Sequence, residues 1–215
     1  MSIEPALRAG CAALGLALDD AALTRLARLS DELRRWNKAY NLTAVDDPAR
    51  ILTQHLLDSL SAARALDGTT IADVGTGGGF PGLPLAIAFP ERRFTLIDTV
   101  EKKLRFVAHA ARTLQLANVT PLHARVERLA PGTAFDTVIT RAFAPLPRSC
   151  AWVQPLCDEH THVVAMKGRW PPAPNSDEAG ELPAGWRIAE VRAVVVPGLD
   201  AERHLLGLRF TPAAT

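Results

Sequence analysis

A glycine-rich loop holds the residues of this chain best suited to bind a ligand. Asp73 precedes Gly75, Gly77 and Gly79, and Phe80 closes the loop. Glycine lets the backbone turn tightly and lets a ligand approach the main chain. The helix expected after Phe80 adds unpaired N–H groups at its first turn. This spacing predicts that a ligand lies over residues 73–80, although a glycine-rich turn alone is also typical of dinucleotide binding.

The acidic residues near this loop favour one class of cofactor. A carboxylate at Asp73 can hold the cationic amino group of a methionine moiety, whereas it would repel a pyrophosphate. This favours S-adenosylmethionine over a dinucleotide. Asp98 ends the next expected strand, where its carboxylate can accept hydrogen bonds from the ribose hydroxyls of either cofactor. Val126 follows the third expected strand and could pack on an adenine ring, while Glu127 beside it fits a helix start equally well.

The segment after the fourth expected strand should hold the methyl acceptor, because ligands bind at the carboxyl ends of parallel strands. Residues 140–147 lack the Asn/Asp-Pro-Pro-aromatic pattern of exocyclic-amine methylation. Cys150 and Cys157 fall inside a predicted helix and fit core thiols better than nucleophiles. An acceptor with a free lone pair, such as N7 of guanine, needs no base, only alignment with the sulfonium methyl.

Arg141 is the candidate catalytic residue of this segment, acting through position and charge. Its guanidinium could contact the cofactor carboxylate, or the guanine and its phosphate. A structural salt bridge fits Arg141 equally well. Lys167 ends the fifth expected strand, and Arg125 and His204 could join it in a phosphate-binding rim.

The elements that must position these residues alternate between strands and helices beyond Gly68. The expected strands are Thr70–Val74, Phe94–Asp98, Val119–His123, Phe135–Thr140 and His162–Met166. The helices expected between them are Pro81–Phe89, Val100–Leu116 and Pro145–Cys157. This alternation is typical of a parallel, doubly wound α/β sheet. Trp186–Val196 and His204–Thr211 have no helix between them and predict an antiparallel hairpin. The stretches 170–174 and 176–181 are expected to form an exposed loop.

Residues 1–66 are expected to form a helical extension packed on a cofactor-binding domain at 67–215. Apolar residues recur at helical spacing from Leu23 to Trp36, behind capping candidates Asp19 and Asp20. A second helix is expected over Ala49–Ala65. The polar face of the first long helix is most simply solvated. An alternative hypothesis is that this face grips RNA, through Arg34, Arg35, Lys38 and Asn41.

Composition sets the remaining bounds. The 215 residues carry 24 Lys and Arg against 23 Asp and Glu, so bulk charge does not identify the substrate. Three cysteines without a paired spacing predict neither a disulfide framework nor a metal site. No stretch approaches the ~20 apolar residues that span a bilayer. We expect a cytoplasmic, monomeric protein without a metal.

Eight ordered segments resemble the ribosomal small-subunit methyltransferase G family, also called the glucose-inhibited division protein B family. They are Trp36–Thr43, His55–Ser59, Asp73–Gly82, Lys102–Phe106, Arg125–Glu127, Arg141–Ala144, Lys167–Gly168 and Leu199–His204. One residue departs from the pattern, since the family often has Pro at Gly78. The resemblance implies a class I S-adenosylmethionine-dependent methyltransferase fold, which is Rossmann-like with a seven-stranded, mostly parallel sheet.

The resemblance further implies methylation of guanine N7 in the decoding region of 16S ribosomal RNA. The substrate would be this RNA alone or the small ribosomal subunit that contains it. It places cofactor contacts at Gly75, Phe80, Val126, Glu127 and Arg141. Transfer would be direct and in line, without a covalent enzyme intermediate or a general base. Three alternatives stay open because fold does not fix function: a methyltransferase for small molecules or proteins, a non-enzymatic RNA-binding module, and a dinucleotide-dependent oxidoreductase.

Overall fold

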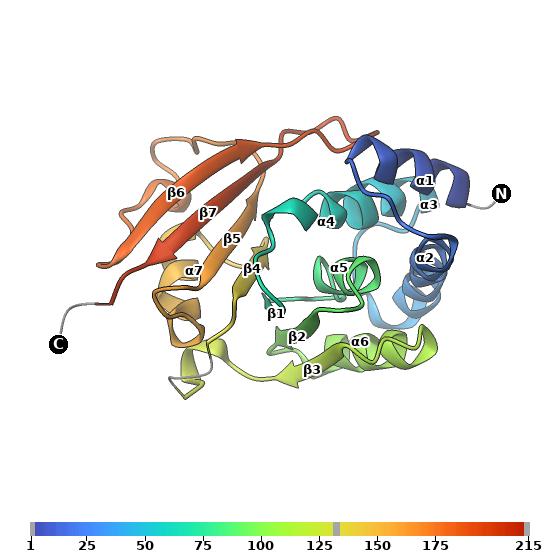
Figure 1. The fold of residues 1–215 in the computed structure, drawn as a ribbon, viewed down its shortest axis with the longest axis horizontal. Helices are drawn as coiled ribbons and strands as arrows, with labels where there is room; N and C mark the ends of the chain where they lie inside the picture. The colour runs from blue at the N-terminus through green and yellow to red at the C-terminus, as the bar shows by residue number, and fades with distance from the viewer. Residues whose placement is uncertain (1–2, 131–133, 213–215) are drawn as a thin grey trace.

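A seven-stranded sheet forms the centre of the computed structural model, which describes residues 3–130 and 134–212. The strand order is β3-β2-β1-β4-β5-β7-β6 (Figure 1). The strands are β1 (Thr70–Val74), β2 (Arg93–Asp98), β3 (Val119–His123), β4 (Thr137–Arg141), β5 (His162–Lys167), β6 (Trp186–Ala193) and β7 (His204–Phe210). Strands β1 to β5 are parallel, and β7 runs antiparallel to both β5 and β6. The predicted mostly parallel sheet closed by a hairpin is confirmed.

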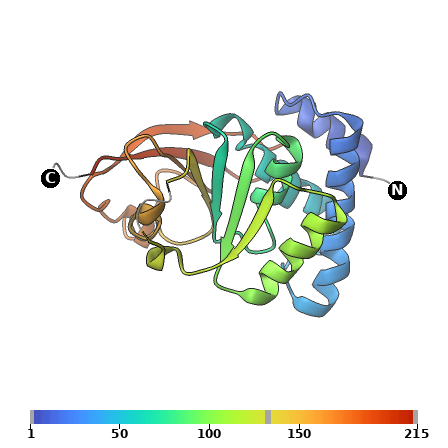
Figure 2. The same ribbon diagram turned by 60° about the horizontal axis from the view of Figure 1, so that its bottom comes forward.

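Helices cover both faces of this sheet (Figures 1 and 2). One face carries α1 (Glu4–Ala13), α2 (Asp20–Tyr40), α3 (Pro48–Ile51), the π-helix η1 (Leu52–Leu57), α4 (Asp58–Leu60), η2 (Ala63–Ala65), α5 (Gly82–Ala88) and α6 (Glu101–Thr113). The other face carries η3 (Val126–Arg128), α7 (Leu146–Val153) and η4 (Gln154–Leu156). A further single turn, η5 (Asp177–Ala179), lies between β5 and β6. No helix of the described residues is both long and apolar enough to cross a membrane.

The side-chain alternation of the strands divides the core into two apolar clusters. Ile71 of β1 and Leu96 of β2 point to the face covered by α2, α5 and α6. Ala72 and Ile97, one position along, point to the α7 face. Because both faces are covered, the central strands read as continuous apolar runs in the sequence.

The N-terminal helices share the first of these clusters. Leu7, Leu26 and Leu56 are fully buried together with Leu83 of α5 and Phe106 of α6. Asp19 caps α2 by accepting a hydrogen bond from the backbone N–H of Ala22 at 2.7 Å, as its position predicted. We propose that residues 1–66 are a layer of the same folding unit as residues 67–215.

The second predicted helix is the main departure from the sequence-based expectation. The continuous helix expected over Ala49–Ala65 is replaced by α3, η1, α4 and η2 in succession. A π-helix widens the turn by one residue and is frequently found at functional sites. In this chain it lies beside the cofactor loop, and the backbone oxygen of Gln54 within it bonds to Arg141 at 3.0 Å.

Candidate functional site

The cofactor loop turns sharply between β1 and α5. Gly75, Gly77 and Gly79 have φ values of +71°, +59° and +87°, a left-handed region that side chains disfavour. The N–H groups of Gly75 and Thr76 both donate to the carbonyl of Ile97, at 2.9 and 3.0 Å. These bonds hold the loop at the end of β2, so that its backbone lines the two cavities described below.

Asp73 supports this loop from beneath and does not line the cavity. Its side chain is fully buried. One carboxylate oxygen accepts hydrogen bonds from the Thr76 hydroxyl at 2.6 Å and the Gly82 N–H at 2.8 Å. The other oxygen has no hydrogen-bond partner among the described residues. Asp73 is therefore not among the residues that line either cavity, and its contact with the cofactor amino group stays a prediction.

Burial raises the pKa of Asp73 to about 6, and the hydrogen bonds from Thr76 and Gly82 oppose that rise. Arg141 also favours the ionised form. The carboxylate is thus poised between its protonated and charged states near pH 6.

A smaller cavity of about 310 Å³ continues from this loop along the ends of β2 and β3. Asp98 on its wall is 8% exposed and accepts hydrogen bonds from the N–H groups of Gly77 and Val100, both at 2.8 Å. Val126 is a buried wall residue, and Glu127 lies beside it with its carboxylate 3.7 Å from Arg125. An apolar slot next to a carboxylate suits an adenine ring and its ribose.

Two aromatic residues of this slot were missed by the sequence analysis. Phe143 and Trp152 line the cavity, with ring centroids 5.5 Å apart in an edge-to-face arrangement. Phe143 also lies against Gly75, where a Cβ atom would come within 2.3 Å of its ring. The aromatic residue two positions after Arg141 was the available signal.

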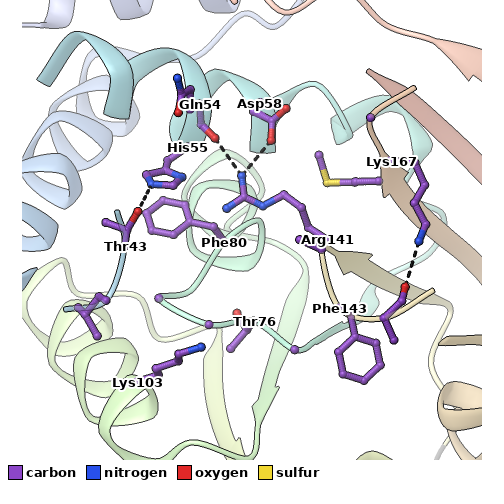
Figure 3. Close-up of a pocket in the computed structure, with 18 of the residues that line it drawn as sticks. Thr43, Gln54, His55, Asp58, Thr76, Phe80, Lys103, Arg141, Phe143 and Lys167 are labelled. Carbon is purple, nitrogen blue, oxygen red and sulfur yellow. Dashed lines mark hydrogen bonds and ion pairs between the residues drawn. The ribbon is translucent and has the colours of Figure 1, made fainter. Parts of the chain in front are cut away.

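A larger cavity of about 730 Å³ lies between the cofactor loop, the ends of β4 and β5, and the N-terminal helices. Figure 3 shows that its labelled side chains come from segments far apart in the sequence. Thr43, Gln54, His55 and Asp58 belong to the N-terminal helical layer. That layer therefore forms one wall of the site.

Arg141 and Arg203 meet at one buried carboxylate in this cavity. Asp58 is 3% exposed. Its two oxygens accept from Arg141 Nη1 at 2.9 Å and from Arg203 Nε at 2.6 Å. Arg141 was predicted either to form a structural salt bridge or to lie in the pocket. It does both, because the paired guanidinium still lines the cavity (Figure 3). Arg203, from the loop before β7, was not singled out as a site residue.

His55 forms part of the wall beside Phe80. The two rings stack with centroids 5.0 Å apart, and His55 Nε2 lies 2.9 Å from the Thr43 hydroxyl. Burial, followed by the nearby positive charge of Arg141, lowers the pKa of His55 to about 4. The ring is therefore neutral at physiological pH and a weak base.

Lys167 and Glu178 form an ion pair at the β5 side of the same cavity. Lys167 Nζ donates to Glu178 Oε1 at 2.7 Å and to the carbonyl of Ala144 at 3.0 Å. Glu178 Oε2 accepts from the N–H of Leu146 at 3.0 Å. The segment 176–181 is mostly exposed, as expected. Glu178 within it nevertheless turns inward and caps the start of α7, where Pro145 has no side-chain cap to offer. Lys167 is 12% exposed and is thus a cavity residue, not a free cation of an RNA-binding rim.

The other predicted RNA-contacting residues are not gathered around this cavity. Arg35 pairs with Glu32 at 3.1 Å, and Arg34, Lys38 and Asn41 lie on the C-terminal half of α2 or at its end without lining either cavity. Arg125 is exposed at the edge of the smaller cavity. The ring of His204 is held 2.7 Å from the carbonyl of Gly168.

The thiols of the chain lie away from the site. Cys11, Cys150 and Cys157 line neither cavity, and burial raises the pKa of each, to about 11, 12 and 12. Within residues 3–130 and 134–212, no three His, Cys, Asp or Glu side chains are grouped so that they could hold a metal ion.

The strand order, the glycine loop and the carboxylate at the end of β2 define a class I S-adenosylmethionine-dependent methyltransferase. Solved structures share this fold. A SAM-dependent methyltransferase from Aquifex aeolicus matches with a TM-score of 0.57 and 17% identity over 79% of this chain and 97% of its own. Magnesium protoporphyrin IX methyltransferase from Synechocystis matches with a TM-score of 0.56 and 20% identity over 90% and 98%.

Comparison with known sequences identifies the family of this methyltransferase. The model of the rRNA small subunit methyltransferase G family matches residues 22–206, and the chain belongs to this family. A ribosomal RNA small subunit methyltransferase G from Methylococcus capsulatus is 48% identical over 87% of this chain and 89% of its own length. One from Stutzerimonas stutzeri is 46% identical over 94% and 93%. The protein is thus a methyltransferase that uses S-adenosylmethionine.

Proposed function

We propose that this enzyme methylates N7 of a guanine in the decoding region of 16S ribosomal RNA. The relatives that cover almost the whole chain are named for methylation of small-subunit ribosomal RNA. The observation that carries the N7 assignment is the acceptor side of the larger cavity, where the described residues of the lining include no thiol. The imidazole there, His55, has a pKa lowered to about 4. Ring N7 has a free lone pair and requires neither a nucleophile nor a base.

The residues of the two cavities fit the cofactor. Gly75 and Gly77 leave an open backbone cradle between the cavities. Asp98 offers its carboxylate to ribose hydroxyls, and Val126 with Phe143 forms an apolar slot for adenine. S-adenosylmethionine supplies, when bound, an electrophilic methyl group that a nucleophile takes directly and in line. The chain contributes binding, alignment and exclusion of water, which can lower a barrier substantially without proton transfer.

Arg141 supplies a positive charge to the acceptor site. Asp58 fixes its guanidinium through Nη1, and the remaining N–H groups stay available to an anion such as the cofactor carboxylate or a nucleotide phosphate. Arg203 beside it adds a second guanidinium. We propose that the substrate partner is 16S RNA or the small subunit, that the reaction takes place in the cytoplasm where ribosomes are made, and that the enzyme acts as a monomer.

Nucleoside mapping tests this function. Small subunits and naked ribosomal RNA from cells lacking the protein would be incubated with it and methyl-labelled cofactor, then digested and analysed by mass spectrometry. We expect one new N7-methylguanosine in 16S RNA. Label appearing only in a metabolite or protein extract would favour the alternative acceptor classes. Turnover without any N7-methylguanosine in ribosomal RNA would reject the proposal.

A further inference from the structure

Glu178 occupies the β5 side of the larger cavity in a fixed orientation. Its Oε1 accepts from Lys167 Nζ at 2.7 Å, and its Oε2 accepts from the backbone N–H of Leu146 at 3.0 Å. Lys167 is itself anchored by the carbonyl of Ala144 at 3.0 Å, a bond drawn in Figure 3. Each oxygen of Glu178 therefore has one protein donor, and a carboxylate oxygen can accept a second.

The other carboxylate of this cavity is already committed. Both oxygens of Asp58 are taken by guanidinium groups, from Arg141 and Arg203. Asp58 is also 3% exposed, whereas the Glu178 side chain is 33% exposed and can be reached from the cavity. Among the described residues that line this cavity, Glu178 is the carboxylate open to a ligand.

The two edges of guanine differ in the groups they present. N7 and O6 are acceptors on one edge, while N1–H and the N2 amino group are donors on the opposite edge. When N7 faces the cofactor loop, the N1 and N2 donors must face away from it. Two parallel donors match the two oxygens of one carboxylate, as in bidentate pairing elsewhere.

We propose that Glu178 recognises the N1–H and N2 amino edge of the target guanine and that Lys167 positions it. This inference rests on the proposed function, because it concerns the acceptor of the same site. Adenine presents an N1 lone pair where guanine presents N1–H, so the same carboxylate would repel it. Glu178 is thus a specificity-determining residue for guanine.

The carboxylate also assists the transfer through its charge. The N7 lone pair forms the new N–C bond while the S–C bond breaks, and its electron pair stays on sulfur. The positive charge passes from sulfur to the purine, and no proton leaves. Hydrogen bonds from a purine that is becoming cationic strengthen against a carboxylate, so Glu178 stabilises the transition state more than the ground state.

The experiment compares enzyme variants on substrates that differ by one amino group. Small subunits would be reconstituted with 16S RNA carrying guanosine, inosine or adenosine at the mapped target nucleotide. Inosine keeps N7, O6 and N1–H and lacks only the N2 amino group. We expect wild-type kcat/KM to be roughly 10- to 100-fold lower for inosine, the usual loss for a hydrogen bond to a charged group. Glu178→Gln should lower kcat/KM on guanosine and narrow the guanosine-to-inosine ratio to about threefold, because an amide offers one acceptor in place of two.

Glu181→Gln is the matched control, since Glu181 is exposed in the same segment and lines neither cavity. It should keep the wild-type ratio. Equal wild-type rates on guanosine and inosine would overturn the inference whatever the variants do, as would a Glu178→Gln enzyme with the wild-type ratio. If Glu178→Gln turns over too slowly, calorimetry with guanosine and inosine monophosphates on the cofactor-loaded enzymes would compare the ground-state part of the preference, which should be smaller in Glu178→Gln than in wild type. Wild-type enzyme that forms no N7-methylguanosine would instead reject the proposed function.

Discussion

Charged side chains at short range fix one another around the larger cavity and under the cofactor loop. Asp58 joins two arginines, Glu178 holds Lys167, and Asp73 lies under the cofactor loop with one oxygen unpaired. Buried ion pairs add little net stability, but removing one partner leaves a costly uncompensated charge. These residues therefore determine side-chain positions, and single substitutions among them should have large effects.

Asp58→Asn should lower the free energy of unfolding by about 3 kcal/mol, near the lower end for broken buried pairs, because both arginines keep some contact with water. Arg141 is 19% exposed and Arg203 is 26% exposed. Urea denaturation would measure the change. Asp46→Asn, at an exposed carboxylate before the same helical segment, should stay within about 0.5 kcal/mol of wild type. Equal effects of the two substitutions would contradict the role of Asp58.

Asp73 gives a pH dependence of known sign. Its pKa is raised from 3.8 to about 6 by burial, so the folded state binds a proton more tightly than the unfolded state. Its contribution to stability is present below pH 4 and lost as pH rises to about 6. Relative to Asp73→Asn, wild type should lose at most about 3 kcal/mol across that window, for about two pH units at roughly 1.4 kcal/mol each.

Urea denaturation of both proteins from pH 4 to 7.5 would follow that difference. Asp136→Asn serves as the contrast, because hydrogen bonds from Thr69 and Thr70 lower the pKa of Asp136. Its stabilising contribution is present at neutral pH and is lost as pH falls below the usual range of an aspartate. If the free energy of unfolding of wild type rose with pH relative to that of Asp73→Asn, the sign would be wrong. The raised pKa of Asp73 would then be rejected.

The backbone conformation of two elements, the cofactor loop and the π-helix η1, determines the geometry of the site. The cofactor loop needs three left-handed glycines. The π-helix η1 brings Gln54 and His55 to the cavity, and the start of α4 directly after it brings Asp58. A regular α-helix over the same residues would place these side chains at different angles around the helix axis, because it has fewer residues per turn than a π-helix. The backbone conformation of both elements is therefore as important as the side chains they carry.

Gly79→Ala and Gly78→Ala should show whether an added methyl group in the loop is harmful because of backbone strain and crowding, or merely because it lies near the cofactor. Gly79 has a φ of +87°, and a Cβ there would lie 2.3 Å from Leu83. We expect a loss of about 2–3 kcal/mol from left-handed strain and overpacking, with weaker cofactor binding. At Gly78 a Cβ meets no atom closer than 3.7 Å, so Gly78→Ala should be nearly neutral. Thermal unfolding and calorimetry with S-adenosylmethionine would compare them, and equal losses would contradict this account.

The helix α2 and the hairpin β6–β7 lie at opposite sides of the molecule (Figure 1). Figure 1 shows α2 at one side and β6 at the other. The larger cavity reaches α2 through Leu33 and the following loop through Leu42 and Thr43. RNA entering that cavity would therefore pass close to the exposed C-terminal half of α2, where Arg35 and Lys38 lie.

The double variant Arg35→Gln, Lys38→Gln should raise KM for small subunits several-fold and reduce its salt dependence, because phosphate contacts release counterions. Cofactor affinity should not change, since neither residue lines a cavity. Arg187→Gln, at an exposed position of β6 on the far hairpin, is the control and should leave KM unchanged. An unchanged KM in the double variant would remove α2 from the RNA-binding surface.

Local patterns in the sequence were sufficient for the sheet, the cofactor loop and the family. The strands β1 and β3 begin and end where the apolar runs predicted, and the others differ by one to three residues at an end, because side-chain alternation and turn residues are local properties. The glycine spacing predicted a bound ligand, and Asp73 favoured S-adenosylmethionine over a dinucleotide, because these residues lie close together in the sequence. The RNA contacts expected at Arg34, Arg35, Lys38 and Asn41 stay predictions.

Only the tertiary structure decided which charges meet. Asp58 lies 83 residues from Arg141 and 145 from Arg203, and Glu178 reaches the start of α7 from a segment with the composition of an exposed loop. No sequence period records such contacts, because they depend on how separate layers pack across the sheet. The same packing buried Asp73 beneath its loop and enclosed Lys167 with Glu178. The sequence by itself determined the cofactor and the fold, whereas packing decided which side chains line the larger cavity.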